Sequence, residues 1–219
     1  EHPGDIFSRI QLHTDMGTDE VLWPLYEKVC QLSAEKYEDW FLPLDDLASL
    51  YHYQANKARG GGWASTVTDD QWDRFRDRSR ATIETFKTAI QREPGAPCLW
   101  RVMANKMYHS GIERNKAISV LKTGYALDPA DLRSVEPALV FSQPRWGGNF
   151  KTAKKAADWF AETAPDGAPT RHVHLYLFTV LMRDCKAEII AQHRETVRSA
   201  VEKLLNAPNA RIEEIEAAE

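Results

Sequence analysis

Three prolines at nearly constant spacing constrain the fold of this chain more than any other feature. Pro94, Pro129 and Pro165 lie 35 and 36 residues apart, in the segments QREPGAP, ALDPADL and ETAPDGAP. A fourth, Pro208, follows after 43 residues. Proline cannot continue a helix that precedes it, but it fits the first turn of the next helix. The spacing therefore predicts helical units of about 34 residues, each closed by a proline turn.

Apolar residues repeat every three or four positions before these prolines, as they do on one buried helix face. The period-two alternation of strands is scarce. We therefore predict an all-α fold, a tetratricopeptide-like (TPR-like) α-α superhelix of stacked helix-turn-helix repeats. The clearest apolar series are Trp72, Phe75, Ser79, Ile83, Phe86 and Ile90, then Phe150, Ala153, Ala157 and Phe160, and finally Ile190, His193, Val197, Ala200 and Leu204.

Helix ends are also visible in the sequence. Thr68 and Gln71 form a capping box, Asn149 suits an N-cap, and Gly60 and Gly111 stand where helices stop. The expected helices cover 39–59, 69–92, 96–110, 114–127, 130–143, 149–163, 169–183 and 188–206. We expect a single helical-repeat domain over 1–219, with leading helices in 1–38, a first pair with a glycine-rich insert in 39–94, TPR-like repeats in 95–129, 130–165 and 166–208, and an acidic tail in 209–219.

Composition is that of an ordinary globular protein, with 43% hydrophobic and 27% charged residues. The net charge of −4 gives no reason to expect a nucleic-acid partner, because phosphate binding relies on clustered Lys and Arg. No apolar run is long enough to span a bilayer. A cytoplasmic location is expected, with a periplasmic or secreted one as the alternative if a leader was removed. Cys30, Cys98 and Cys185 are widely spaced, so we expect neither a disulfide framework nor a thiolate metal site.

Two loops inside the repeats combine arginine, tryptophan and glycine. One is Ala58–Val67, which contains Arg59 and Trp63, and the other is Pro144–Asn149, which contains Arg145 and Trp146. Arginine and tryptophan often anchor interfaces. The structural alternative is that each tryptophan plugs a gap beneath a long turn while the glycines shape that turn.

At these residues the sequence resembles a bacterial domain-of-unknown-function family of TPR-like helical-repeat proteins. The resemblance covers about 40–165, and it implies a helical-repeat fold but no reaction. Asn149 stands where that family has a small hydroxyl residue, and both can cap a helix. The matching residues are Ala58, Arg59, Gly60, Gly62, Ala64, Thr66 and Val67, then Arg145, Trp146, Gly147 and Gly148.

Few residues suggest catalysis. His172 and His174 would point to opposite sides of a helix, and the Gly60–Gly62 run lacks the lysine of a phosphate loop. No metal or other cofactor is expected. We expect a non-enzymatic scaffold or adaptor for a protein or peptide, with Arg145 and Trp146 as rim anchors. The alternatives are a small-molecule sensor or hydrolytic enzyme with a pocket by the Gly60–Trp63 insert, and an immunity-type partner of a secreted toxin. The first-helix residues expected on the binding face are Asp45, Tyr51, Tyr53, Gln54, Trp100, Asn105 and Tyr108.

Overall fold

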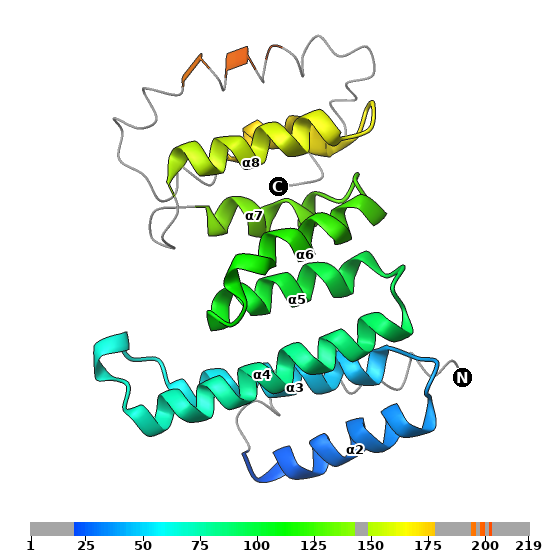
Figure 1. The fold of residues 1–219 in the computed structure, drawn as a ribbon, viewed down its shortest axis with the longest axis vertical. Coiled ribbons are helices and arrows are strands. Elements are labelled where there is room, and N and C mark those ends of the chain that lie inside the picture. The colour runs from blue at the N-terminus through cyan, green and yellow to red at the C-terminus, as the bar shows by residue number, and fades with distance from the viewer. Residues whose placement is uncertain (1–19, 143–148, 178–193, 196–197, 200–201, 203–219) are drawn as a thin grey trace. The chain divides into compact units, whose positions relative to one another are not determined.

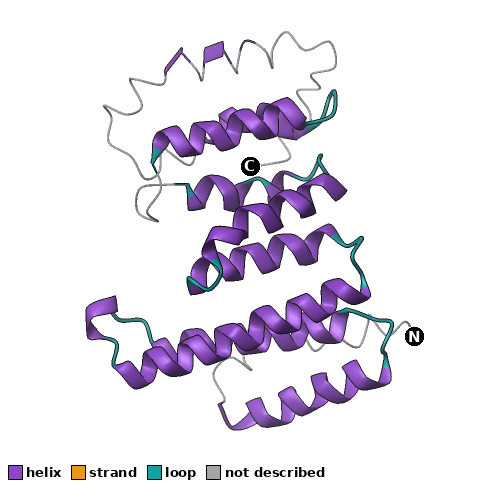
Figure 2. Cartoon of the chain, viewed as in Figure 1, coloured by secondary structure: helices purple, strands orange, loops and turns teal. Residues whose placement is uncertain are grey.

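The computed structural model describes residues 20–142, 149–177, 194–195, 198–199 and 202. Over these residues the regular structure is entirely helical, without a strand (Figure 2). The predicted all-α class is therefore confirmed. The chain divides into two compact units, Glu1–Ala117 and Ile118–Glu219. The single repeat domain and the TPR-like superhelix stay predictions.

The first unit is built from helices that pack in chain order. Helix α2 packs against α3, α3 against α4, and α4 against α5 (Figure 1). Ala48 and Ala55 of α3 are fully buried, and their small side chains permit a close approach to the neighbouring helix. The elements are η1 (Glu20–Leu22), α2 (Trp23–Lys36), α3 (Leu42–Arg59), η2 (Ala64–Thr66), α4 (Asp69–Arg92) and α5 (Pro97–Ser110), followed by α6 (Arg114–Leu127), which crosses into the second unit.

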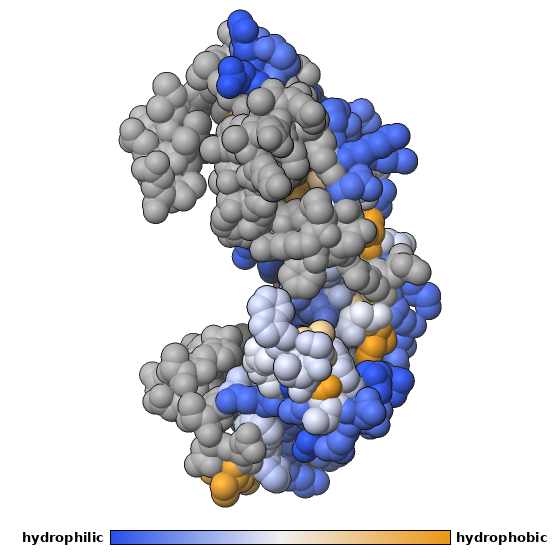
Figure 3. All heavy atoms as spheres, turned by 90° about the vertical axis from the view of Figure 1, so that its left-hand side faces the viewer, coloured by the Kyte–Doolittle hydropathy of each residue, from blue (hydrophilic) through white to orange (hydrophobic). Residues whose placement is uncertain are grey.

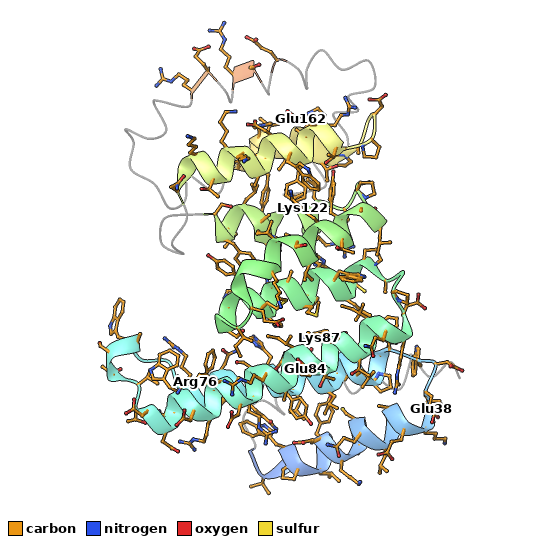
Figure 4. All side chains as sticks on the ribbon, in the orientation of Figure 1. Glu38, Arg76, Glu84, Lys87, Lys122 and Glu162 are labelled. Atoms are coloured by element: carbon orange, nitrogen blue, oxygen red, sulfur yellow. The ribbon has the colours of Figure 1, made fainter. Side chains whose placement is uncertain are left out.

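Helix α4 follows its sequence signals closely. The Thr68 side chain accepts a hydrogen bond from Gln71 N, and the Gln71 side chain accepts one from Thr68 N at 2.9 Å, so the predicted capping box is confirmed. The predicted apolar stripe is buried along the same helix, from Phe75 through Phe86 to Ile90. The opposite face carries the exposed ion pairs Arg76–Asp73 and Arg80–Asp77, and Arg76 is labelled in Figure 4.

One arginine holds the α2–α3 turn against the end of α4. Arg92 Nη1 donates to the carbonyl oxygens of Ala34 at 3.1 Å, Tyr37 at 3.3 Å and Trp40 at 3.2 Å. The last carbonyls of a helix have no partner within that helix, so they need an external donor. Arg92 therefore caps α2 from a position more than fifty residues away.

The second unit departs from the predicted pattern at one point. The expected helix over 130–143 is instead a short η3 (Leu132–Ser134) followed by α7 (Glu136–Phe141). Asp131 caps η3 by accepting from Arg133 N at 3.0 Å, and Pro137 stands in the first turn of α7. Proline has no N–H to extend an existing helix, so the helix restarts there. Helices α8 (Phe150–Thr163) and η5 (Pro169–His172) follow, and Asn149 N-caps α8 as predicted.

An aromatic cluster forms the core of this unit. The rings of Tyr125 and Phe160 lie 4.7 Å apart, and those of Trp159 and Phe160 lie 5.0 Å apart. Lys122, labelled on α6 in Figure 4, places its ammonium 4.1 Å from the Trp159 ring centre. The Tyr125 hydroxyl donates to the Phe160 carbonyl at 3.2 Å, and the buried Thr170 hydroxyl donates to the Pro129 carbonyl. The cluster therefore buries aromatic surface with its hydroxyls bonded.

On the face shown in Figure 3, the described residues are largely hydrophilic, with isolated apolar areas. None of the helices in the described part of the chain is both long enough and apolar enough to cross a bilayer.

Candidate binding loop and adjoining cavity

The glycine-rich insert between α3 and α4 is a loop with a fixed backbone. Gly60 ends α3 with a φ of 74°, a conformation that a side chain would strain. A Cβ at Gly62 would lie 2.6 Å from Thr66 Oγ1, so only glycine fits there without a shift. The Trp63 carbonyl accepts from Thr66 N at 2.9 Å and from Thr66 Oγ1 at 2.8 Å, which closes η2. The pattern of glycine, threonine and capping residues is thus explained by the loop itself.

Trp63 directly precedes η2 in this loop, and the loop projects beyond the ends of α3 and α4 in Figure 1. Its side chain is 84% exposed. The alternative that Trp63 plugs a gap under the turn is wrong, because its side chain is exposed. Arg59, in contrast, contacts neighbouring residues. Its Nη1 donates to the Gly60 carbonyl at 3.1 Å, and its guanidinium lies 5.4 Å from the centre of the Trp72 ring.

A cavity of about 890 Å³ opens among α2, α3 and α4 and reaches the base of the same loop. Its volume falls within the range of small-ligand sites in proteins, about 300–1,000 Å³. Each of the three helices contributes side chains to its lining, among them Trp23 and Glu27 from α2, Gln54 and Lys57 from α3, and Arg74 and Arg78 from α4.

Two buried polar atoms in this wall lack a partner. Gln54 is only 6% exposed, and neither its Oε1 nor Trp23 Nε1 has a hydrogen-bond partner within the described part of the chain. Leaving a buried donor or acceptor unsatisfied costs about 1–3 kcal/mol. Such atoms are not confined to the cavity wall, because Ser79 Oγ, Arg101 Nε and Ser134 Oγ also lack a partner within the described residues.

The charges around the cavity are unequal. Four basic side chains line it, Lys28, Lys57, Arg74 and Arg78, but only two acidic ones, Glu27 and Asp77. Both acids are already matched by the protein. Glu27 accepts from Tyr51 Oη at 3.0 Å and lies 3.8 Å from Arg78, and Asp77 pairs with Arg80 at 3.1 Å. Arg74 pairs with Asp70 at 2.8 Å. Among the described residues, no carboxylate lies within ion-pair distance of Lys28 or Lys57. The excess charge of the wall is positive.

A second group of ionisable residues lies on α3 and α5. Burial raises the pKa of Asp45, and the Lys106 ammonium opposes that rise. Burial lowers the pKa of Lys106, with Asp45 again opposing the shift. Burial, together with the charges of Lys106 and His109, lowers the pKa of His52 to about 3. We interpret the group as a partly buried charge pair with a neutral histidine beside it.

Asp46 points to a different neighbour than Asp45, because successive helix residues are turned by about 100°. Burial and the adjacent Asp45 raise its pKa to about 6. Burial raises the pKa values of Tyr26 and Cys30, and the charge of Asp46 adds to both increases. The pKa of Cys30 rises to about 12. A thiol with so high a pKa is a poor nucleophile. Within the described residues, no cluster of three or more His, Cys, Asp and Glu side chains could hold a metal ion.

The residues predicted from the sequence as a binding site lie in different environments in the structure. Trp63 is exposed and Gln54 lines the cavity. Tyr51 and Tyr108, expected on an open binding face, are 9% and 7% exposed and belong to the core, because their rings fill space between helices. Trp100 is also engaged, since its Nε1 donates to the Pro94 carbonyl at 2.9 Å and braces the α4–α5 turn.

Of the remaining predicted residues, Asn105 is partly buried on α5 and is not among the residues that line the cavity. Arg145 and Trp146 lie outside the described residues. Sequence reasoning missed most of the residues that line the cavity, Trp23 and Arg78 among them. Trp23 precedes the regular repeats, and Arg78 sits in an alternating charge run that reads as a solvated helix face.

Comparisons with known proteins add no family at this point. No family model matches the chain, and no curated protein and no solved structure matches it. Any proposal about function therefore rests on the all-helical fold, the exposed loop and the cavity.

Proposed function

We propose that the protein is a non-enzymatic adaptor of TPR-like type that binds a partner protein through the Trp63 loop. The observation that carries the proposal is the 84% exposed indole on a loop whose η2 turn is closed by two hydrogen bonds from Thr66 to the Trp63 carbonyl. Tryptophan is the residue type most enriched among interface hot spots. A loop that is already ordered loses little conformational entropy on binding, so more of the contact energy becomes affinity.

The surroundings of the loop favour a protein over a membrane surface as the partner. Asp69 and Asp70 follow the loop directly and are exposed. An anionic bilayer attracts basic segments and repels carboxylates. A protein with an apolar pocket for one indole fits these features better.

The experiment is site-specific photo-crosslinking in the native host. A photo-reactive phenylalanine analogue at position 63 is compared with the same analogue at position 127, where Leu127 is exposed on α6. We expect one protein to be crosslinked from position 63 only. Its capture should be competed by excess wild-type protein and not by the Trp63→Ala variant. A product competed equally by both proteins would contradict the proposal.

Circular dichroism of Trp63→Ala must match the wild type, so that loss of competition is not loss of folding. The identity of the crosslinked protein then specifies the kind of adaptor: a secreted toxin would assign the immunity role. The rim anchors proposed at Arg145 and Trp146 are tested in the same assay with Arg145→Glu and Trp146→Ala as competitors.

A further inference from the structure

We propose that the protein forms a two-fold homodimer through the outer face of α2, in which the α2 helices of two copies pack antiparallel. This interface goes beyond the adaptor function. It uses different residues from the Trp63 loop, so either proposal can fail without the other.

The outer face of α2 is an exposed apolar stripe. The inner face, with Cys30 and Ala34, is buried against α3, and both α3 and α4 lie on one side of α2 (Figure 1). Along the outer face, beginning at the N-cap, four aliphatic side chains are between 38% and 63% exposed: Leu22, Leu25, Val29 and Leu32. The outermost helix of a packed helical array needs a polar outer face for solubility unless another helix covers it. The stripe therefore indicates a surface that another helix covers.

The spacing of the stripe is that of a helix-pairing seam. Its residues follow one another at intervals of three, four and three positions, as the a and d positions of a heptad do: Leu22, Leu25, Val29 and Leu32. A seam of this kind packs against a second seam with the same spacing. Every copy of the chain carries the same seam, so a second copy supplies a matching surface in a two-fold contact.

Charge complementarity favours a second copy and sets its direction. Lys28 and Glu35 are exposed at the same edge of the stripe, seven residues or about two helical turns apart. Within the described residues, neither lies within ion-pair distance of an opposite charge. In an antiparallel pair, Lys28 of one copy meets Glu35 of the other, and the two-fold axis repeats the contact. In a parallel pair, each would lie level with the same residue of the other copy, so neither contact would form.

The charges also determine which apolar residues meet. In the antiparallel pair, Val29 of one copy lies level with Leu32 of the other. A helix rises about 1.5 Å per residue, so Lys28 then lies about 3 Å along the helix axis from Glu35 of the second copy. A shift of one heptad would instead bring the two Lys28 ammonium groups side by side. The charges therefore favour the register that is centred on Val29 and Leu32.

The test is sedimentation velocity of the full chain over a series of concentrations. We expect a monomer–dimer equilibrium with a dissociation constant on the order of 10 μM, because a single helix pair makes a small interface. Leu32→Gln should raise this constant more than about tenfold, since it removes apolar contact area from both copies. Leu127→Gln, the same change at an exposed leucine of α6, should leave it unchanged. Trp63→Ala should dimerise like the wild type, whatever it does to partner capture.

Two outcomes of this experiment would overturn the dimer. One is a wild-type protein that stays monomeric up to about 1 mM, a concentration at which even a weak specific contact is populated. The other is a monomeric wild type whose Leu32→Gln variant is less stable to urea than Leu127→Gln. That result would mean that another segment of the same chain covers the stripe. Circular dichroism of each variant confirms that it is folded.

Charge reversal tests the antiparallel pairing itself. Lys28→Glu and Glu35→Lys should each raise the dissociation constant about tenfold, because each variant places like charges together at both ends of the helix pair. The double variant should dimerise like the wild type. An equimolar mixture of the two single variants should form a heterodimer, since each copy supplies the charge that the other lacks. Single variants that dimerise like the wild type, or a mixture that dimerises no better than its components, would overturn the pairing.

Discussion

Gln54 in the first unit and Tyr125 in the second are both buried polar side chains, at 6% and 2% exposure, but they are satisfied differently. The Tyr125 hydroxyl donates to the Phe160 carbonyl at 3.2 Å and packs among aromatic rings. Gln54 Oε1 meets no donor within the described residues. A buried polar group that the fold satisfies contributes to stability, whereas one that is left without a partner costs stability.

The same contrast holds for the tryptophans. Trp159 packs against Tyr125 and Phe160, with Lys122 over its ring. Trp63 contributes no packing, and its loop is held by backbone and threonine contacts instead. The comparison separates residues whose packing stabilises the folded state from exposed residues that do not. Each stability prediction below compares variants of the two kinds.

The largest effect is expected from the aromatic cluster. Phe160→Ala should lower the free energy of unfolding by about 3–5 kcal/mol, because it removes a fully buried ring and leaves a cavity. Trp63→Ala should change it by less than about 0.5 kcal/mol, since the exposed indole supports no packing. Urea denaturation followed by circular dichroism measures both. A large loss for Trp63→Ala would show that the loop is part of the folded core after all.

A smaller change in the free energy of unfolding should distinguish the two buried polar side chains, Tyr125 and Gln54. Tyr125→Phe should destabilise by about 1 kcal/mol, because it removes a satisfied hydrogen bond and the Phe160 carbonyl still accepts from Ala164 N at 2.9 Å. Gln54→Met should be neutral or stabilising, since it removes an unsatisfied buried acceptor. Matched urea curves decide the comparison. Destabilisation of the Gln54 variant by as much as the Tyr125 variant would mean that the protein itself satisfies Oε1.

A separate, pH-dependent effect concerns acid stability and the charge group of α3 and α5. His52 has its pKa lowered from 6.5 to about 3, so the stability that its neutral form contributes is present above pH 6.5 and lost as pH falls towards 3. Asp46 has its pKa raised from 3.8 to about 6, so its contribution is present below pH 3.8 and lost as pH rises through 6. The two oppose each other between these limits.

His52→Gln removes one side of this balance. We therefore expect the variant to lose less stability than the wild type between pH 7 and pH 4, with Lys106 and His109 present in both proteins. Urea midpoints at pH 7, 5.5 and 4 give the measurement. Parallel curves for wild type and His52→Gln would contradict the assigned shift.

Much of the local structure could be predicted from the sequence because its causes are local. The Thr68–Gln71 capping box and the Asn149 N-cap depend on residues a few positions apart. The α4 stripe depends only on the helical period, and its residues from Phe75 to Ile90 are buried as that period requires. The second unit shows where prediction from periodicity fails. One helix was expected from the apolar pattern, but the Asp131 cap and Pro137 divide that segment into η3 and α7.

The sequence by itself determined the helical class, the positions of most caps and turns, and the loop that carries Trp63, because propensity, periodicity and glycine sterics act over short stretches of chain. Only the tertiary structure decided that Tyr51 and Tyr108 are core residues while Trp63 is exposed. It also decided that Trp23, Gln54 and Lys57 meet at one cavity and that Arg92 caps a helix far away in the sequence. These outcomes depend on which helix faces pack together, and burial of a polar group costs or contributes energy only once its neighbours in space are fixed.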